Sequence, residues 1–412
     1  MKNPSGQFPY TRREFLGRGV RGLSLIAFSG FAPGFLTRSL LAGNPQPGKD
    51  SSILVLVQLA GGNDGLNTII PFEDDRYFRL RPTLAIPKTK SIPIGGLLGL
   101  HPELSDFRPL LDDGKLAILQ NVGYPNPNRS HFRSTEIWES AAGSDDFLPT
   151  GWLGRFFDAR CAGMDGPAGI HLSTETPPSF LGAAPHETFG LPARAGRGRS
   201  GSTAKGAERA LLEQIPEAGS SNLTFLKHTM LDAIVTEEKI QSILAGPGRS
   251  SLYPESGLGG SLRNIATLIA ADLPTRVYFV SLGGFDTHSN QAATHGDLLR
   301  TLAEAMRAFQ ADLEAKGVAD RVLTMTFSEF GRRPAENNGR GTDHGTAAPL
   351  FVMGSSLHGG IHGDRPDLDL QPKSDLEYSI DFRGIYARIL DRWLDCPSEA
   401  ELGGKFDAPE FV

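Results

Sequence analysis

Acidic residues and histidines recur at several points along the chain, next to short apolar runs. Six of these side chains offer the carboxylate oxygens and imidazole nitrogens that bind metal ions: Asp64, Asp286, His288, Glu329, Asp343 and His344. A mixed set of this kind suits zinc, manganese or iron better than calcium. Carboxylates crowded together without a cation would repel one another and take up protons, and a bound dication resolves that repulsion. The set therefore predicts a site for a divalent metal, although each residue alone could equally be a turn or capping residue.

A serine lies at the start of a predicted helix. Ser130 follows a loop rich in Pro and Asn, and the backbone N–H groups at a helix N-terminus stabilise an anion. Beside a dication, such a serine could act as a nucleophile toward a phosphoryl or sulfuryl centre. Arg129 and Arg133 flank it and could hold the oxygens of a substrate. The same position suits a simple helix cap, and that alternative stays open.

Regular secondary structure must bring these residues together. Residues 53–57 read Ile-Leu-Val-Leu-Val, the pattern of a strand buried on both faces. Similar strands are expected at 115–121, 276–282, 321–327 and 349–353, and helices near 103–112, 131–141, 223–244, 260–271, 295–316 and 382–394. This alternation predicts a three-layer α/β/α fold with a largely parallel central sheet. Residues just past the carboxyl ends of parallel strands gather in one crevice, so we expect the clusters around Asp64, Asp286 and Glu329 to meet.

The first forty or so residues have the order of a twin-arginine export signal. Thr11-Arg12-Arg13-Glu14-Phe15-Leu16 is followed by a weakly apolar stretch from about Gly22 to Leu36. That stretch is too short and too interrupted by Gly and Pro to span a bilayer stably. Small residues near Ala42 offer a cleavage site. We therefore expect residues 1–42 to be a signal peptide that the twin-arginine machinery uses to bring the protein to the periplasm or otherwise out of the cytoplasm.

Charge and hydropathy exclude two classes of protein. The 412-residue chain has 41 Lys and Arg against 47 Asp and Glu, and loss of residues 1–42 would leave 35 against 46. This acidic balance argues against a general nucleic-acid-binding protein, which would show a basic surface. Because no run of 18 apolar residues follows the signal, we expect no stable membrane span in the mature chain.

Residues 50–412 are expected to form a single domain. Strand signals weaken at about 165–260, so this segment is interpreted as an elaboration on the core sheet, and residues 193–207 as a loop rich in Gly, Ser and Ala. The two cysteines, Cys161 and Cys396, fit neither a zinc-finger nor a redox spacing. Two separate buried thiols are favoured over a disulfide, which the sequence does not exclude.

Five motifs, in this order, resemble a known bacterial family. They are Gly61-Gly62-Asn63-Asp64-Gly65, Arg129-Ser130-His131-Phe132, Phe285-Asp286-Thr287-His288, Ser328-Glu329-Phe330-Gly331-Arg332 and Asp343-His344-Gly345. Behind a twin-arginine signal, they resemble the uncharacterised family called domain of unknown function 1501, over nearly the whole mature chain. That family is similar in turn to the alkaline-phosphatase-like superfamily, which includes phosphatases, sulfatases and cofactor-independent phosphoglycerate mutases.

The superfamily resemblance implies roles for three residues. The metal-binding Asp after the first strand resembles Asp64, the nucleophile at a helix start resembles Ser130, and the late His before a final strand resembles His344. The sulfatase signature Cys/Ser-x-Pro-x-Arg is absent around Ser130 and Cys161, which disfavours a formylglycine sulfatase.

Two positions depart from the superfamily pattern. The usual Asp-x-x-x-His becomes Asp286-x-His288, and the usual Asp-His after a late strand becomes Glu329-Phe330. One imidazole ligand is therefore missing from the expected place. The resemblance then implies one metal ion or a rearranged pair.

These observations predict an exported metal-dependent hydrolase of phosphate or sulfate esters, acting on a small anionic ester. Ser130 would attack, the dication would polarise the substrate oxygen, and Arg129 or Arg133 would steady the anion. The alternative is a noncatalytic exported binding protein with a degenerate alkaline-phosphatase-like site. The pair Glu329-Phe330 favours that alternative, whereas the retained Asp, His and Ser residues favour the enzyme.

Overall fold

The structure is a computed structural model of the chain. It describes residues 51–173, 175–191, 212, 221–246, 250–370 and 374–412. The expected signal peptide with Arg12 and Arg13, and the loop at 193–207, lie outside the described residues. The described residues belong to one compact unit.

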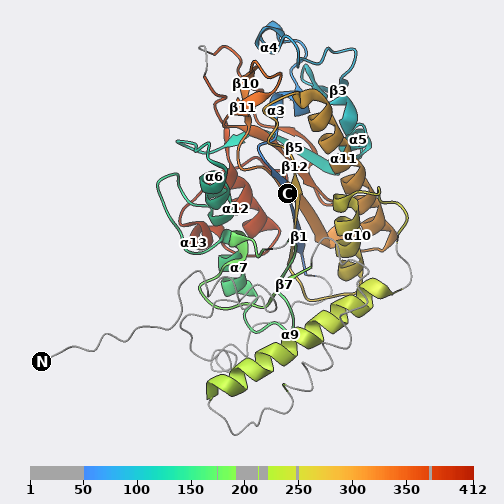
Figure 1. The fold of residues 1–412 in the computed structure, drawn as a ribbon, viewed down its shortest axis with the longest axis vertical. Helices are drawn as coiled ribbons and strands as arrows, with labels where there is room; N and C mark the ends of the chain where they lie inside the picture. Colours follow the sequence, from blue (N-terminus) through green and yellow to red (C-terminus); the bar gives the residue numbers. More distant parts are fainter. Residues whose placement is uncertain (1–50, 174, 192–211, 213–220, 247–249, 371–373) are drawn as a thin grey trace, which may run out of the picture. The chain divides into compact units, whose positions relative to one another are not determined.

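A mixed sheet runs through the centre of this unit (Figure 1). Within the described residues it has nine strands, in the order β13-β5-β12-β9-β1-β8-β6-β7, with β14 also beside β5. They are β1 (Ile53–Ala60), β5 (Leu116–Gly123), β6 (Gly169–Leu172), β7 (Thr188–Gly190), β8 (Val277–Gly283), β9 (Val322–Phe327), β12 (Ala348–Met353), β13 (Gly360–His362) and β14 (Ile380–Asp381). Strand β12 is antiparallel to its neighbours β5 and β9, and the other pairs are parallel. The prediction of a largely parallel sheet is confirmed.

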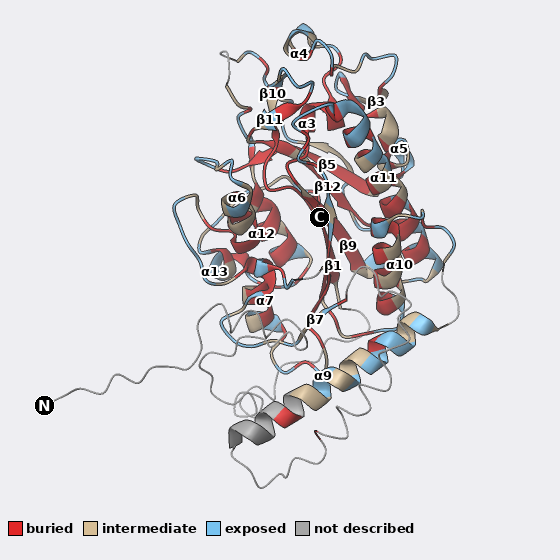
Figure 2. Ribbon diagram, viewed as in Figure 1, coloured by how far each residue is buried: buried red, intermediate tan, exposed pale blue. Residues whose placement is uncertain are grey.

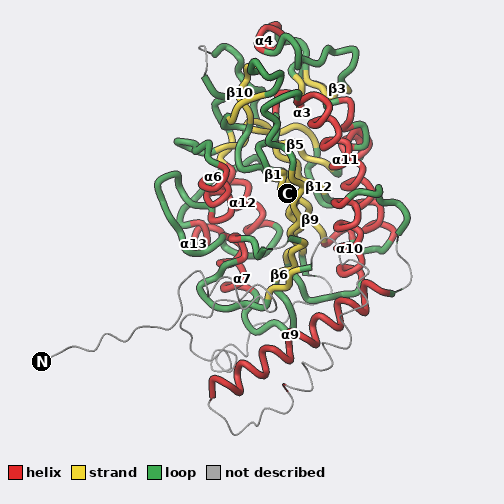
Figure 3. The backbone as a smooth tube through the Cα atoms, in the orientation of Figure 1, coloured by secondary structure: helices red, strands yellow, loops and turns green. Residues whose placement is uncertain are grey.

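Helices cover both faces of the sheet, as Figure 3 shows with the strands between two groups of helices. One group comprises α5 (Phe107–Asp112), α10 (Gly257–Ala270) and α11 (Gln291–Ala315), and the other α6 (His131–Ser140), α7 (Trp152–Arg160), α12 (Phe382–Arg392) and α13 (Ser398–Leu402). Alternate side chains of a strand point to opposite faces. Accordingly, Val55 and Val57 of β1 pack with the first group, and Leu54 and Leu56 with the second. The central strands are therefore buried on both sides (Figure 2), and the three-layer prediction is confirmed.

Every strand and helix named in the sequence prediction has a counterpart, but short elements were missed. The strands are β1, β5, β8, β9 and β12, and the helices are α5, α6, α9 (Ser221–Ala245), α10, α11 and α12. The elements without a prediction are α3 (Gly65–Thr68), α4 (Asp75–Leu80), α7, α13, β6, β7, β13, β14, the small sheet β2 (Ile69–Ile70), β3 (Ile92–Gly95) and β4 (Leu98–Leu100), and the ribbon β10 (Arg332–Glu336) with β11 (Thr342–His344). Three short 3₁₀ turns, Pro102–Leu104, Pro178–Phe180 and Ala319–Arg321, complete the described secondary structure. Strands β6 and β7, from the segment interpreted as an elaboration, extend the central sheet beyond β8.

Neither a membrane-spanning helix nor a disulfide is found in the part of the chain that the structure describes. No helix there combines the length and the apolar character that a bilayer crossing requires. Cys161 and Cys396 are both free and buried, in the core beneath α7 and α12.

The sheet brings the chemistry-bearing loops to one edge. Ala60 at the end of β1 lies opposite Gly283 at the end of β8, and Gln58 lies opposite Phe327 at the end of β9. The loops that follow these three parallel strands therefore leave the sheet at the same edge. Strand β12 runs the other way, so its beginning, which His344 precedes by four residues, reaches this edge as well.

Candidate metal centre

Three ligand atoms from the loop after β8 and from β11 converge at this edge. Nε2 of His288 lies 2.9 Å from Nε2 of His344, and Oδ1 of Asp286 lies 3.1 Å from each of them. In a tetrahedral zinc site with bonds of about 2.0–2.1 Å, the ligand atoms are about 3.3–3.4 Å apart. The observed triangle is slightly smaller, so a small outward shift of the side chains would admit an ion. Donor types and spacing both fit a divalent transition metal.

His131 adds a further imidazole from the first turn of α6. Its Nε2 lies 3.6 Å from Oδ2 of Asp286. His131, Asp286 and His344 form a group whose ligand atoms all lie within 4.8 Å of one another. His131 belongs to the motif Arg129-Ser130-His131-Phe132, but it is not among the residues that the sequence predicts to bind a metal. Its position directly after Ser130 was the available signal, but sequence spacing does not show that this face of α6 turns toward the loop after β8.

Glu329 contacts the ring nitrogen of His131 that faces away from Asp286. Its Oε1 lies 2.8 Å from Nδ1 of His131 and accepts a second hydrogen bond, of 2.8 Å, from the backbone N–H of Gly61. A metal-binding histidine commonly donates its other ring N–H to a carboxylate, which fixes the tautomer and leaves Nε2 free. The structure thus places Glu329 behind an imidazole of the group. The imidazole that Glu329 contacts therefore comes from α6 and not from the loop after β9.

Asp343 occupies a comparable position behind His288. Its Oδ1 lies 3.5 Å from Nδ1 of His288 and accepts a hydrogen bond from the side chain of Asn337. The hydrogen bond from Asn337 is the main reason that the pKa of Asp343 lies below its ordinary value. Asp343 is therefore an anion that can hold the ring of His288 with Nε2 toward Asp286.

Asp64 has a protein cation as its partner. Its carboxylate is fully buried, with Oδ2 2.6 Å from Nη1 of Arg81, which is also fully buried. Gln291 donates to the same oxygen. Burial alone would raise the pKa of this carboxyl group, but Arg81 and Gln291 hold the pKa of Asp64 below its ordinary value. Asp64 thus forms a buried ion pair through Oδ2, and it is not among the described residues whose ligand atoms group with Asp286, so its predicted role as a metal ligand stays a prediction.

Arg332 ties the loops together beneath Asp286. Its guanidinium is fully buried and donates to the backbone carbonyls of Gly61, Gly62, Phe285 and Thr342. Its Nη2 also lies 2.7 Å from Oδ1 of Asp286. Partial burial raises the pKa of Asp286, but Arg332 and His344 lower it more strongly, to about 2. The side chain of Asp286 is therefore ionised at neutral pH.

The two glycines after β1 are needed for this close packing. Gly61 has φ +122°, and a Cβ there would lie 2.3 Å from the backbone nitrogen of Asp286. A Cβ on Gly62 would lie 2.4 Å from the ring of Phe330, which packs against the rings of His131 and His344. Glycine allows both the conformation and the approach. The Gly-Gly pair thus lets the loops after β1, β8 and β9 touch.

Ser130 lies between two residues that contact this group. It is the N-cap residue of α6, but its hydroxyl makes no capping hydrogen bond and the residue is exposed. The carbonyl of Arg129 accepts a 2.9 Å hydrogen bond from Nδ1 of His344, and His131 follows directly. A capping serine would accept a hydrogen bond from the second or third N–H of the helix. The hydroxyl of Ser130 is thus not engaged as a cap.

The two arginines that flank Ser130 have different surroundings. Arg129 is 43% exposed and pairs with Asp375 at 3.0 Å. Arg133 donates through Nη2 to the carbonyls of Gly143, Ser144 and Asp146, and its guanidinium lies 3.8 Å from the ring centre of Phe147. Arg133 is thus committed to the loop after α6, whereas Arg129 stays at the surface beside Ser130.

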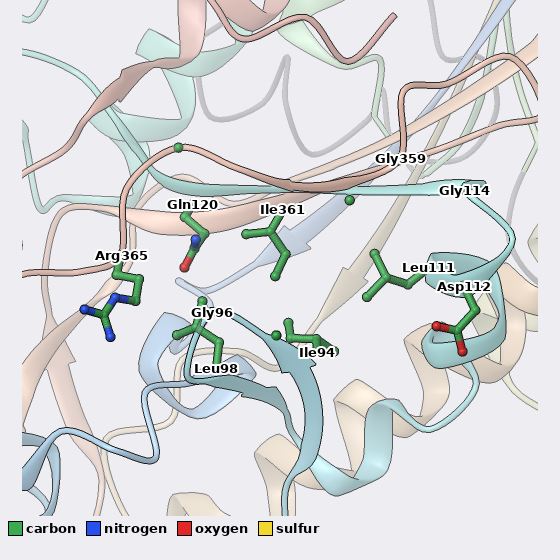
Figure 4. Close-up of a pocket in the computed structure, with 13 residues that line it drawn as sticks. Ile94, Gly96, Leu98, Leu111, Asp112, Gly114, Gln120, Gly359, Ile361 and Arg365 are labelled. Carbon is green, nitrogen blue, oxygen red and sulfur yellow. The ribbon is translucent and has the colours of Figure 1, made fainter.

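A hollow of about 540 Å³ lies elsewhere, between the β3–β4 hairpin and strands β5 and β13. Figure 4 shows its apolar wall of Ile94, Leu98, Leu111 and Ile361. Its lining residues include no histidine and no serine. The hollow therefore lacks the metal-ligating and nucleophilic side chains that the sequence predicts, and the candidate site lies at the histidine group.

Three solved structures are similar to this chain at low sequence identity. The C-terminal periplasmic domain of EcEptC from Escherichia coli, in complex with Zn, is 10% identical over 76% of this chain and 78% of that chain, with a TM-score of 0.35. The PsFucS1 sulfatase from Pseudoalteromonas sp. is 12% identical over 81% and 68%, with a TM-score of 0.34. TAB5 alkaline phosphatase with Mg bound is 10% identical over 74% and 92%, with a TM-score of 0.32. These TM-scores are too low to carry a conclusion about activity.

The sequence comparisons give one family. Among curated proteins, none matches this chain. The family described as "Protein of unknown function (DUF1501)" matches residues 115–390, a span that includes Ser130, the three convergent ligands, and Glu329. The matched span contains four of the five sequence motifs, and Gly61-Gly62-Asn63-Asp64-Gly65 lies before it. The predicted family is confirmed, and this chain belongs to the DUF1501 family.

Proposed function

We propose that the protein is an exported, metal-dependent hydrolase of phosphate or sulfate esters. One observation carries the proposal: Asp286, His288 and His344 direct three ligand atoms to within 3.1 Å of one another. They do so beside Ser130, a serine at a helix N-terminus whose hydroxyl makes no capping bond.

Asp286, His288 and His344 would hold the metal, with His131 as a further ligand. Oδ1 of Asp286 faces His288 and His344, and Oδ2 faces His131, so the set suits one ion or a pair. Zinc, manganese and iron accept such ligands. The bound dication would supply Lewis acidity, which polarises the ester oxygen and stabilises developing negative charge.

The protein's own groups would carry out the remaining steps. Oγ of Ser130 forms a bond to phosphorus or sulfur while the bond to the alcohol oxygen breaks, and the hydroxyl proton leaves with the alcohol. Water then cleaves the seryl ester and releases phosphate or sulfate. The free N–H groups of the first turn of α6 stabilise the anionic transition state. Arg129, at the surface beside Ser130, binds the outer oxygens of the substrate.

Removal of the Asp286 carboxylate tests this proposal. The metal-loaded mature protein should hydrolyse aryl phosphate or aryl sulfate esters, and Asp286→Asn should lower kcat/KM by about 10²-fold or more, because the site loses an anionic ligand. The rate of alcohol release measures this. Asp367→Asn removes an exposed carboxylate outside the centre and serves as the matched control. Equal rates for Asp286→Asn and the wild type would contradict the proposal.

Export through the twin-arginine pathway is the second part of the proposal, and it is supported by the sequence of residues 1–42. Replacing both Arg12 and Arg13 by Lys should leave the uncleaved precursor in the cytoplasm, because the pathway recognises the arginine pair itself. Cell fractionation with an immunoblot measures this. The matched control replaces Arg18 and Arg21 by Lys, the same chemical change elsewhere in the segment. Normal periplasmic appearance of the first variant would overturn this part.

A further inference from the structure

Two phenylalanines near Ser130 are strongly exposed. Phe132 is 92% exposed, Phe147 is 73% exposed, and Leu148 beside it is 41% exposed. Isolated apolar residues are common on protein surfaces, but apolar side chains that gather beside a functional site often mark a binding surface. Phe132 belongs to α6, and Phe147 and Leu148 belong to the loop that follows α6.

Arg133 gives Phe147 a fixed place on the surface. Its guanidinium binds three carbonyls of residues 143–146 and lies under the Phe147 ring. On the other side of this loop, the hydroxyl of Ser144 donates to the carbonyl of Pro125. The loop is thus fastened to the first turn of α6 and to the segment before it. Phe147 is held outward by these bonds.

The geometry of α6 places Phe132 between Phe147 and the histidine group. Successive residues of an α-helix point about 100° apart around the axis. His131 points toward Asp286 and Glu329, and Arg133 points toward the loop that carries Phe147. Phe132, between them in the chain, points to solvent on the side of α6 that separates the two. Phe132 is therefore an exposed side chain of α6 that follows His131 and precedes Arg133, the residue that contacts Phe147.

We propose that Phe132, Phe147 and Leu148 form an apolar platform that binds the alkyl or aryl part of the substrate. The substrate class is then an amphipathic ester, whose phosphate or sulfate group lies at the metal centre and whose apolar body covers the platform. On the anionic side, Arg129 lies next to Ser130 in the chain, and its guanidinium pairs with Asp375. This inference rests on the proposed function, because the metal centre orients the substrate.

A pair of phosphonates that the protein cannot hydrolyse tests the platform separately from turnover. Dodecylphosphonate, below its micelle concentration, should bind the metal-loaded protein at least about tenfold more tightly than methylphosphonate, because the long chain is removed from water. The double variant Phe132→Ser, Phe147→Ser should lose this advantage and bind methylphosphonate as the wild type does. Calorimetry measures both affinities. Leu252→Ser, which removes a 58% exposed leucine elsewhere, is the matched control.

Each result has a distinct meaning. Equal affinity of the wild type for both phosphonates, or an unchanged advantage in the double variant, would overturn the platform. If sedimentation showed that the wild type is a dimer and the double variant a monomer, the platform would be overturned in favour of a contact between two copies of the chain. If the wild type bound phosphatidylcholine vesicles and the double variant did not, while the wild type bound both phosphonates equally, the platform would be overturned in favour of a membrane-binding surface. Failure of both phosphonates to bind, together with absent ester hydrolysis, would instead count against the proposed function.

Discussion

Ser130→Ala should reduce ester turnover by about 10³-fold or more, while the metal content and the free energy of unfolding stay close to the wild-type values. The reason is that Oγ of Ser130 is the proposed nucleophile, and loss of a nucleophile removes the covalent route altogether. Because this hydroxyl makes no capping bond in the structure, its removal should cost little stability. Steady-state kinetics, metal analysis and urea unfolding of the purified variant measure the three quantities.

The matched control for this variant is a serine that does cap a helix. Ser256 is the N-cap of α10, and its Oγ accepts a 3.0 Å hydrogen bond from the N–H of Gly259. Ser256→Ala should therefore lose about 1 kcal/mol of stability and keep its turnover, the opposite pattern. Wild-type turnover by Ser130→Ala would contradict the serine mechanism and leave water as the nucleophile. A phosphoryl group found on the Ser130 peptide by mass spectrometry would support the serine mechanism directly.

His344→Ala should weaken metal binding by about 10- to 100-fold or more, because it removes one of three convergent ligand atoms. The same side chain also donates a hydrogen bond from its Nδ1 to the carbonyl of Arg129, the residue before Ser130. Competition with a chromophoric chelator measures the affinity. His362→Ala is the control, since the ring of His362 bonds to the carbonyl of His358 and not to the centre. Equal affinity in His344→Ala and the wild type would remove His344 from the ligand set.

Much of the fold could be predicted because its longer strands and helices carry clear apolar patterns. The run at residues 53–57 indicated a strand buried on both faces, and β1 lies at the centre of the sheet. Short pairings such as β6 with β7 have too few residues to show a period. The reversed direction of β12 is set by tertiary pairing with β5 and β9, which no local pattern records.

The candidate site could be predicted in part, for a related reason. Position after a strand predicts that Asp286 and His288 lie at one edge of the sheet, and their side chains are 3.1 Å apart in the loop after β8. Position does not say which carboxylate contacts a metal and which contacts a histidine, so Glu329 was grouped with the ligands although it bonds to His131. Nor does it reveal a counter-ion: the partner of Asp64 is Arg81, which has no motif of its own. These distinctions depend on side-chain directions in the folded chain.

The metal content of the wild-type protein tests the central claim most directly. Mature protein, purified without chelator from cells grown in metal-replete medium, should contain about one to two transition-metal ions per chain. Inductively coupled plasma mass spectrometry measures the content and identifies the metal. Metal-free wild-type protein that also fails to take up zinc, manganese or iron would contradict the metal centre and favour a noncatalytic binding protein.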